Sequence, residues 1–169
     1  MNSIKSQKIE KFLDELSSSS PTPGGGAVAA LSAAMAASLV EMVANLTIGK
    51  KGYEKARKDI GILRYKAIGC KSKLLKLADD DVEAFKAVMS AYKTKDKGKI
   101  RKALKKATQV PFKVKEISKK VEALAGRIAK IGNKNAISDA KSAIYLAQSA
   151  AKSADENVKI NRKALAALK

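Results

Sequence analysis

Residues 20–31 read Ser-Pro-Thr-Pro-Gly-Gly-Gly-Ala-Val-Ala-Ala-Leu, and the rest of the chain is organised around this stretch. Two prolines fix φ and prevent a helix from starting before Pro23. Three consecutive glycines then open a long alanine-rich segment, predicted to be helical over residues 25–48. Glycines are tolerated where bare backbone must come close to another helix or a ligand, and free amides at a helix start favour anions. The spacing matches neither GxGxxG nor GxxxxGK[ST], so no nucleotide-binding fingerprint is present.

Composition points to a single all-α domain covering residues 1–169. The chain has 169 residues, no tryptophan and only 4% aromatic residues. Alanine, lysine, leucine and isoleucine dominate, and no segment alternates apolar and polar residues as a half-buried strand would. We therefore expect an up-and-down bundle of about six helices.

Several classes of chemistry are excluded by the residue types that are missing. There is no histidine, and Cys70 is the single cysteine. A histidine-based triad or an ordinary zinc site cannot be built, so any catalysis must use carboxylates, lysines, hydroxyls and amides. The lone cysteine, the lack of a leader-like segment at Met1 and the lack of an apolar run of about 18 residues predict a cytoplasmic protein without a membrane partner.

The net charge of +19 is concentrated in one region. Residues 93–134 contain 15 basic and 3 acidic residues. Such a surface is either a solvated helix face or a site for a polyanion, such as nucleic acid or the polyglutamate tail of a folate. No helix-turn-helix, RNA-binding or zinc-finger pattern is present, and aromatic residues for base stacking are scarce, so nucleic acid is not the expected partner.

Helical periodicity divides the chain into segments with apolar stripes. We expect helices at residues 4–16, 25–48, 53–92, 100–108, 112–131, 138–153 and 155–168, with possible breaks near Asp79 and before Pro111. In residues 25–48 the large apolar side chains step by three or four positions, which predicts that they face the core. They are Val28, Leu31, Met35, Leu39, Met42 and Leu46.

One carboxylate falls on an apolar stripe. Asp81 fills the position between Leu77 and Phe85, whereas Asp79 and Asp80 fall off the stripe and are expected to be solvated. A buried carboxylate needs a partner and tends to have a shifted pKa, which makes Asp81 a functional candidate. A helix cap or a buried ion pair would explain it equally well.

Other polar residues lie at helix ends or on the core side. Residues 132–135 form a predicted turn, and Asp139 follows in the first turn of a helix, where the helix dipole alone would favour it. Asn161 interrupts the last apolar stripe, and Asn157 lies one turn earlier. Lys50 follows the alanine-rich helix, where the dipole favours a cation. Polar groups on inward faces are typical of a site inside a helical bundle.

Five blocks of sequence, in order, resemble the cyclodeaminase/cyclohydrolase family, which includes the cyclodeaminase part of formiminotransferase-cyclodeaminase and methenyltetrahydrofolate cyclohydrolases. The resemblance extends from about residue 9 to residue 165. The matching blocks are residues 21–26 (PTPGGG), 46–53 (LTIGKKGY), 81–85 (DVEAF), 133–139 (NKNAISD) and 157–161 (NVKIN).

This resemblance implies a homodimeric enzyme of one-carbon folate metabolism that needs no metal or redox cofactor. The expected reaction is the hydration of 5,10-methenyltetrahydrofolate to 10-formyltetrahydrofolate. The alternative is the cyclodeaminase reaction, which closes 5-formiminotetrahydrofolate and releases ammonia. Both act on the C–N bonds of a cyclic amidine, and the absence of room for a transferase domain favours the first. A basic nucleic-acid-binding module is the alternative that is not an enzyme.

The predicted site combines these residues with the resemblance. Asp81 or Asp139 is expected to act as the catalytic acid/base. The remaining residues are expected to bind the substrate, the asparagines through its pterin or reacting centre, and Lys50 and the glycine amides through its anionic tail or a developing negative charge. These binding residues are Pro23, Gly24, Gly25, Gly26, Thr47, Lys50, Asn133, Asn157 and Asn161.

Overall fold

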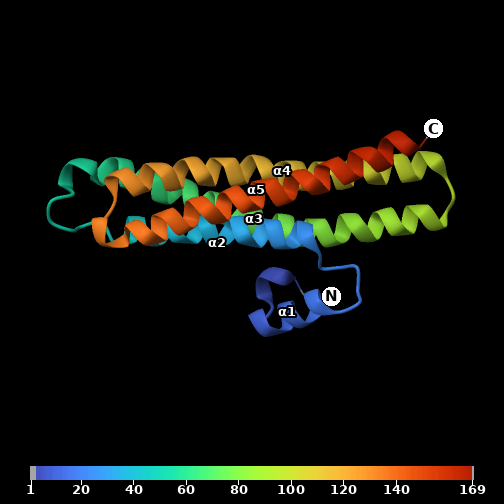
Figure 1. Cartoon of the computed structure of the whole chain (residues 1–169), viewed down its shortest axis with the longest axis horizontal. Coiled ribbons are helices and arrows are strands. Elements are labelled where there is room, and N and C mark those ends of the chain that lie inside the picture. The colour runs from blue at the N-terminus through green and yellow to red at the C-terminus, as the bar shows by residue number, and fades with distance from the viewer. Residues whose placement is uncertain (1–2, 169) are drawn as a thin grey trace.

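Four long helices form an antiparallel bundle in the computed structural model, which describes residues 3–168 (Figure 1). Around the bundle, α2 is adjacent to α3 and α5, and α4 closes the other side between α3 and α5. α2 is the shortest of the four and begins partway along the bundle, so the other three extend beyond it (Figure 1). The all-α prediction is confirmed. The bundle helices are α2 (Gly25–Asn45), α3 (Arg57–Lys93), α4 (Lys97–Ile131) and α5 (Ile137–Ala167).

The remaining elements are short. Helix α1 (Ile9–Ser17) lies beside the bundle, and single turns of 3-10 helix are η1 (Ile4–Ser6), η2 (Glu54–Ala56) and η3 (Lys134–Ala136). Residues 3–168 therefore contain five α-helices rather than about six.

The helix count differs because none of the predicted breaks occurs, and α3 is continuous through Asp79. α4 runs without interruption through Pro111, and α5 runs through residues 153–155. Proline lacks the N–H that would bond to the carbonyl of Ala107, four residues earlier. The side-chain Nδ2 of Asn161 donates to that carbonyl at 3.0 Å. An amide from α5 thus satisfies the acceptor that Pro111 leaves open, and α4 continues.

The prediction for the apolar stripe of α2 is wrong. Met35, Met42 and Leu46 are 53%, 37% and 49% exposed, and Val28, Leu31 and Leu39 are only partly buried. The buried faces of α2 carry alanines and two valines instead. Periodicity identifies residues that share a side of a helix but not which side faces the bundle. Small side chains let neighbouring helices approach closely, so here the alanine side packs inward.

The prediction that no apolar segment is long enough to span a membrane is wrong for α2, which could cross one by length and composition alone. In this structure 56% of its most apolar window is buried inside the bundle. Its hydrophobicity is therefore accounted for largely by packing within the bundle.

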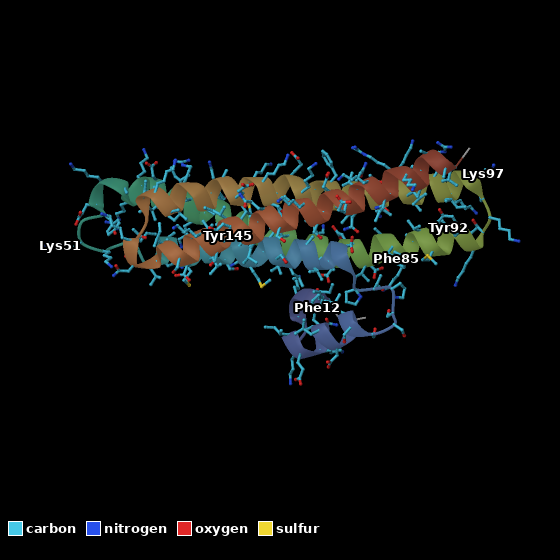
Figure 2. All side chains as sticks on the ribbon, in the orientation of Figure 1. Phe12, Lys51, Phe85, Tyr92, Lys97 and Tyr145 are labelled. Carbon is cyan, nitrogen blue, oxygen red and sulfur yellow. The ribbon has the colours of Figure 1, made fainter. Side chains whose placement is uncertain are left out.

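The N-terminal segment is fastened to α3 by Asp79, which contradicts the prediction that this carboxylate is solvated. It accepts hydrogen bonds from the Ser3 hydroxyl at 2.5 Å and from the Ile4 amide at 2.6 Å. α1 itself has no buried residue, and Ile9 and Leu13 are 79% and 53% exposed. Phe12 lies on α1 below the bundle in Figure 2 and lines a hollow shared with α2.

Candidate functional site

The start of α2 brings bare backbone against a carboxylate. Gly24 is the N-cap of α2, and Gly26 is buried in its first turn. A Cβ atom on Gly26 would overlap the Asp81 carboxylate of α3. A Cβ on Gly25 would lie 3.8 Å from Nδ2 of Asn157, which is ordinary contact. Glycine is therefore needed at position 26 for space, and we call Gly24–Gly26, Asp81 and Asn157 the glycine end.

Asp81 has the electrostatic properties of a proton-transfer group. Burial raises the pKa of this carboxyl to about 6, and a hydrogen bond from the Ala27 amide opposes the shift. Burial favours the neutral form because the carboxylate loses its hydration, whereas the amide favours the charged form. With a pKa of about 6, the group can both accept and release a proton near neutral pH.

Asn157 and Pro23 complete the surroundings of the glycine end. Asn157 reaches it from α5, and its Nδ2 also donates to the Ser153 carbonyl at 3.0 Å. Pro23 is buried and lines a cavity of about 230 Å³ together with Val82 and Glu83, which follow Asp81 on α3.

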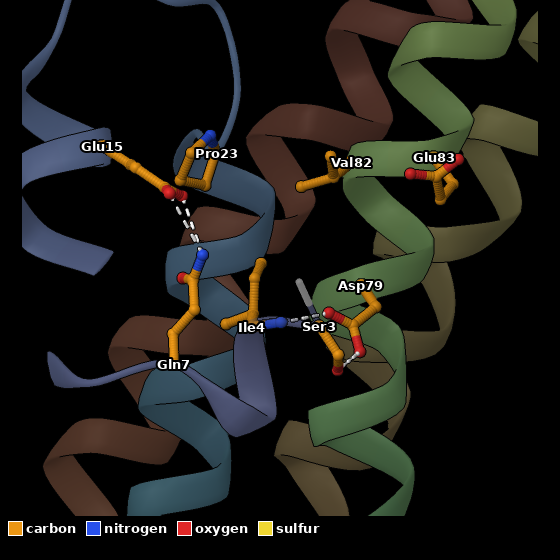
Figure 3. Close-up of a pocket in the computed structure, with 8 residues that line it drawn as sticks. All are labelled: Ser3, Ile4, Gln7, Glu15, Pro23, Asp79, Val82 and Glu83. Carbon is orange, nitrogen blue, oxygen red and sulfur yellow. Dashed lines mark hydrogen bonds between the residues drawn. The ribbon is translucent and has the colours of Figure 1, made fainter. Parts of the chain in front are cut away.

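The N-terminal segment forms the other wall of this cavity, as Figure 3 shows. Gln7 Nε2 donates to a carboxylate oxygen of Glu15 at 3.0 Å, and Asp79 holds the backbone at Ile4. The cavity lies beside the catalytic candidate, and Asp81 itself faces the first turn of α2.

Asn161 has a structural explanation. Its Nδ2 is committed to the Ala107 carbonyl that Pro111 leaves without a donor. An amide on an apolar stripe must find a partner, and this one finds it in a neighbouring helix. Its assignment as a substrate ligand is a prediction that the geometry does not require.

Asn161 and Pro111 should therefore be energetically coupled. Asn161→Ala is expected to lower the free energy of unfolding by about 1–2 kcal/mol, because it leaves a buried carbonyl unsatisfied. In a Pro111→Ala background, the restored backbone N–H should supply the donor, so the same change should cost clearly less. Urea denaturation of the four chains measures the coupling, and equal costs in both backgrounds would contradict it.

A second group of predicted residues lies at the other end of α2. Asn133 Oδ1 accepts from Lys50 Nζ at 3.1 Å, and its backbone N–H donates to Thr47 Oγ1 at 2.9 Å. Thr47 is 1% exposed and donates its own hydroxyl to the Val43 carbonyl. We call Thr47, Lys50 and Asn133 the asparagine end.

Asn133 ties the α2–α3 connection to the α4–α5 connection. Besides those bonds, its Nδ2 donates to the Leu46 carbonyl at 3.2 Å, and its Oδ1 caps η3 by accepting from the Asn135 amide. The residue is 8% exposed, and both polar atoms of its side chain are hydrogen-bonded. Within one chain Asn133 therefore positions Lys50, whose side chain is exposed.

The structure separates the two candidate catalytic carboxylates. Asp139 lies in the first turn of α5, as predicted, next to η3. Asn157, at the glycine end, is eighteen residues further along the same helix, or about 27 Å. Lys51 marks one end of the bundle in Figure 2, and Phe85, one turn after Asp81, lies far along α3 towards the other end. One chain therefore brings together Gly24, Gly25, Gly26, Asp81 and Asn157, but places Thr47, Lys50, Asn133 and Asp139 elsewhere.

Within residues 3–168, no group of three or more His, Cys, Asp or Glu side chains is arranged to hold a metal ion.

Two features of the glycine end could not be predicted from the sequence. The Ala27 amide is the partner of Asp81, and Gly26, rather than Gly25, makes the close approach. Three adjacent glycines look alike in a sequence, and only the packing of α3 distinguishes them.

Comparison with known proteins gives consistent matches over nearly the whole chain. The family described as formiminotransferase-cyclodeaminase matches residues 8–167. A methenyltetrahydrofolate cyclohydrolase from Methylorubrum extorquens is 46% identical over 94% of this chain and 81% of its own length. The crystal structure of a formiminotetrahydrofolate cyclodeaminase from Thermotoga maritima superimposes with a TM-score of 0.92 at 38% identity, covering 96% of this chain and 81% of that one.

A longer relative matches as well. The formimidoyltransferase-cyclodeaminase of Sus scrofa is 30% identical over 95% of this chain, which spans only 31% of that protein.

Proposed function

Because the chain belongs to the formiminotransferase-cyclodeaminase family, we propose that it is a methenyltetrahydrofolate cyclohydrolase, which hydrates 5,10-methenyltetrahydrofolate to 10-formyltetrahydrofolate. The observation that carries this choice is the relative from Methylorubrum extorquens, which has that name and matches most of both chains. The cyclodeaminase activity is the second candidate, because the similar structure from Thermotoga maritima has that name.

The proposed reaction needs a base that takes a proton from the attacking water and then an acid that gives a proton to N5. Water adds to the bridging carbon between N5 and N10, and a proton leaves the attacking oxygen. In the resulting tetrahedral intermediate the C–N5 bond breaks as N5 takes up a proton. The hydroxyl group on the carbon loses its remaining proton to solvent, so the carbon becomes the formyl group on N10. Ionised Asp81 accepts the first proton and returns one to N5, so a single carboxyl group performs both transfers.

The environment of Asp81 suits this role. The methenyl substrate carries a positive charge on the N5–C–N10 group, and a half-buried carboxylate attracts that charge more strongly than a solvated one. The pKa of about 6 keeps the group close to the balance point between its two forms. The Asn157 amide and the free amides at the start of α2 would hydrogen-bond the pterin ring or the hydroxyl of the tetrahedral carbon.

We further propose a homodimer formed through the outer side of α2. This side exposes Met35, Met42 and Leu46, and Glu41 is the only charged residue in α2 although the chain carries +19 overall. Exposed apolar patches of this kind mark interaction surfaces, and a symmetric contact places the same surface on both partners. A low charge on the contact surface avoids repulsion between two strongly basic chains.

An antiparallel pairing of the two α2 helices would complete the site. It places the glycine end of one chain beside the asparagine end of the other, so Lys50 of the partner subunit could meet the anionic tail of a folate. In such a dimer, Lys50 and Asp139 would have their predicted roles in the site of the neighbouring chain rather than in the site of their own chain.

Disrupting this contact should abolish the dimer and the activity together. Met35→Glu combined with Met42→Glu places four carboxylates at the contact, and we expect a monomer by light scattering with activity reduced at least tenfold. Met89→Glu is the control for a charge at an exposed methionine outside α2, because Met89 is 47% exposed and lies on α3, eight residues beyond Asp81. A double variant that stays dimeric would contradict the proposed interface.

Mixed dimers test whether the site is shared. An Asp81→Asn chain and a Lys50→Ala chain, mixed at random, would form about half mixed dimers, each with one intact site, and recover about a quarter of the wild-type activity. No recovery would place both residues in one chain's site.

The activity itself is tested with both substrates. Purified protein is added to 5,10-methenyltetrahydrofolate, and the loss of near-UV absorbance is followed after correction for spontaneous opening. Ammonia release from 5-formiminotetrahydrofolate is measured in parallel. We expect faster turnover of the first substrate. Faster ammonia release would assign the cyclodeaminase, and no acceleration of either reaction would overturn the proposal.

A further inference from the structure

A long groove follows the seam between α3 and α4 and contains neither Asp81 nor Asn133. Three adjoining hollows of about 820, 320 and 380 Å³ make it up. The first and second share Lys73 and Lys120, and the second and third share Leu77, Asp80 and Lys113. The groove is therefore continuous along much of both helices, and we call it the α3–α4 groove.

Cations line this groove at a regular spacing. Lys106, Lys113, Lys120 and Arg127 follow one another on α4 at intervals of seven residues, or about 10.5 Å along the helix. Lys66 and Lys73 face them from α3 with the same interval. In the part of the chain that the structure describes, none of these six forms an ion pair.

The floor of the α3–α4 groove is apolar and has the same period. Val110, Ile117 and Leu124 follow each other on α4 at seven-residue intervals. At the rim, Ile68 and Phe112 are 37% and 45% exposed. An apolar floor with charged walls, both repeating every seven residues, matches the pattern by which one helix recognises another.

Two other occupants fit this groove less well. A second copy of the chain would bring the same row of cations against itself in a symmetric contact, which is repulsive. A nucleic-acid strand carries a negative phosphate at every nucleotide. Along this groove its phosphates would be repelled by Asp80, Glu83 and Glu116, which lie in the middle and at the far end. It would also gain little from the aliphatic floor, since base binding relies on aromatic stacking.

We propose that the α3–α4 groove docks an amphipathic helix of another protein, with an apolar side against the floor and Glu or Asp residues every seven positions against the cations. The wide end of the groove binds the most acidic part of that helix, because it is lined by four cations and no acidic residue: Lys66, Lys73, Lys120 and Arg127.

The probe is a fluorescein-labelled peptide of three heptads with Leu and Ala on one side and Glu on both flanks. Its affinity is measured by fluorescence anisotropy at physiological salt, beside a scrambled peptide of identical composition and a single-stranded oligonucleotide of the same length. We expect the heptad peptide to bind at least tenfold more tightly than the scrambled one, because only the former presents a continuous apolar side.

Charge reversal then locates the binding surface. Lys113→Glu/Lys120→Glu/Arg127→Glu should weaken peptide binding by about tenfold or more, as expected for three ion pairs at a partly exposed interface. The matched control reverses three exposed cations of α4 outside the groove, Lys105→Glu/Lys119→Glu/Lys130→Glu, and should change affinity by less than about threefold.

A neutral change separates shape from charge. Gly69 lines the wide hollow, and a Cβ there meets nothing within 4 Å, so Gly69→Trp fills the groove without disturbing the helix. Gly61→Trp, at an equally open position of α3 outside the groove, is the control. Gly69→Trp should abolish peptide binding and leave the thermal midpoint unchanged or higher.

Equal binding of heptad and scrambled peptides, tighter binding of the oligonucleotide, or unaltered peptide binding by Gly69→Trp would each overturn the proposal. None of these outcomes depends on the enzymatic activity.

Discussion

Replacing Asp81 with asparagine should lower the rate of methenyltetrahydrofolate opening at least about 100-fold, the lower range for loss of a general acid/base. Asparagine has the same size and still accepts the hydrogen bond of the Ala27 amide, but it cannot take up or release a proton near neutral pH. Single-turnover rates at saturating enzyme measure the effect. Asp80→Asn is the matched control, since Asp80 is adjacent but lines the α3–α4 groove, and its rate should stay within about twofold of wild type.

The same substitution should stabilise the protein at neutral pH. Because burial raises the pKa of Asp81 from 3.8 to about 6, the folded state binds its proton more tightly than the unfolded state. The resulting stability is fully present below pH 4 and is lost as the pH rises through about 6. Asp81→Asn removes this penalty, so at pH 8 it should gain up to about 3 kcal/mol, and at pH 4 it should gain almost nothing.

These two results separate catalysis from structure. A carboxylate that only holds helices together would lose stability when replaced, and the folded fraction would keep its turnover. A destabilised Asp81→Asn protein with near-normal turnover per folded molecule would remove Asp81 from the mechanism. Asp139 would then be the candidate base.

Adding one methyl group at Gly26 should have an effect of similar size. In Gly26→Ala the new Cβ would occupy the space of the Asp81 carboxylate, so either the carboxylate or the start of α2 must move. We expect turnover to fall about 100-fold and the free energy of unfolding to drop by about 1–3 kcal/mol, as for other overpacked sites. Turnover and urea denaturation are measured on the same preparation.

Gly25→Ala is the matched control for this prediction. Its Cβ would lie 3.8 Å from Nδ2 of Asn157, a normal contact, and position 25 is exposed. We expect less than about threefold loss of turnover and a slight gain in stability, because alanine is the better helix former. If Gly25→Ala proves as damaging as Gly26→Ala, the glycines serve close approach of a ligand rather than of Asp81.

The sequence predicted the elements of the fold better than their packing. The all-α class follows from composition and the inward position of Asp81 from helical periodicity, and both agree with the structure. The outward side of α2 could not be predicted, because alanines and large apolar residues give equally good stripes, and the neighbours decide which side packs inward. The sequence likewise predicts a helix end before Pro111, because Asn161, the donor that replaces the missing N–H of Pro111, is fifty residues away in the chain.

The candidate site could be predicted only in part for a related reason. Residue type and helix position single out Asp81, but Lys50, Asn133 and Asp139 lie at the other end of the bundle. The order of the matching sequence blocks contains no information on the distances between them in space. It therefore could not show that the glycine end and the asparagine end are separate groups within one chain. The homodimer, the cytoplasmic location and the independence from cofactors stay predictions.

The most direct test of the account is the pH dependence of kcat/KM for 5,10-methenyltetrahydrofolate, corrected at each pH for spontaneous opening. Because the free enzyme must hold Asp81 in its ionised form to accept a proton from water, kcat/KM should rise as the pH increases and level off above an inflection near pH 6, the pKa to which burial raises Asp81. The residual rate of Asp81→Asn should show no such inflection. A flat wild-type profile between pH 4.5 and pH 8, or an inflection that survives in Asp81→Asn, would contradict the assignment of Asp81 as the catalytic base.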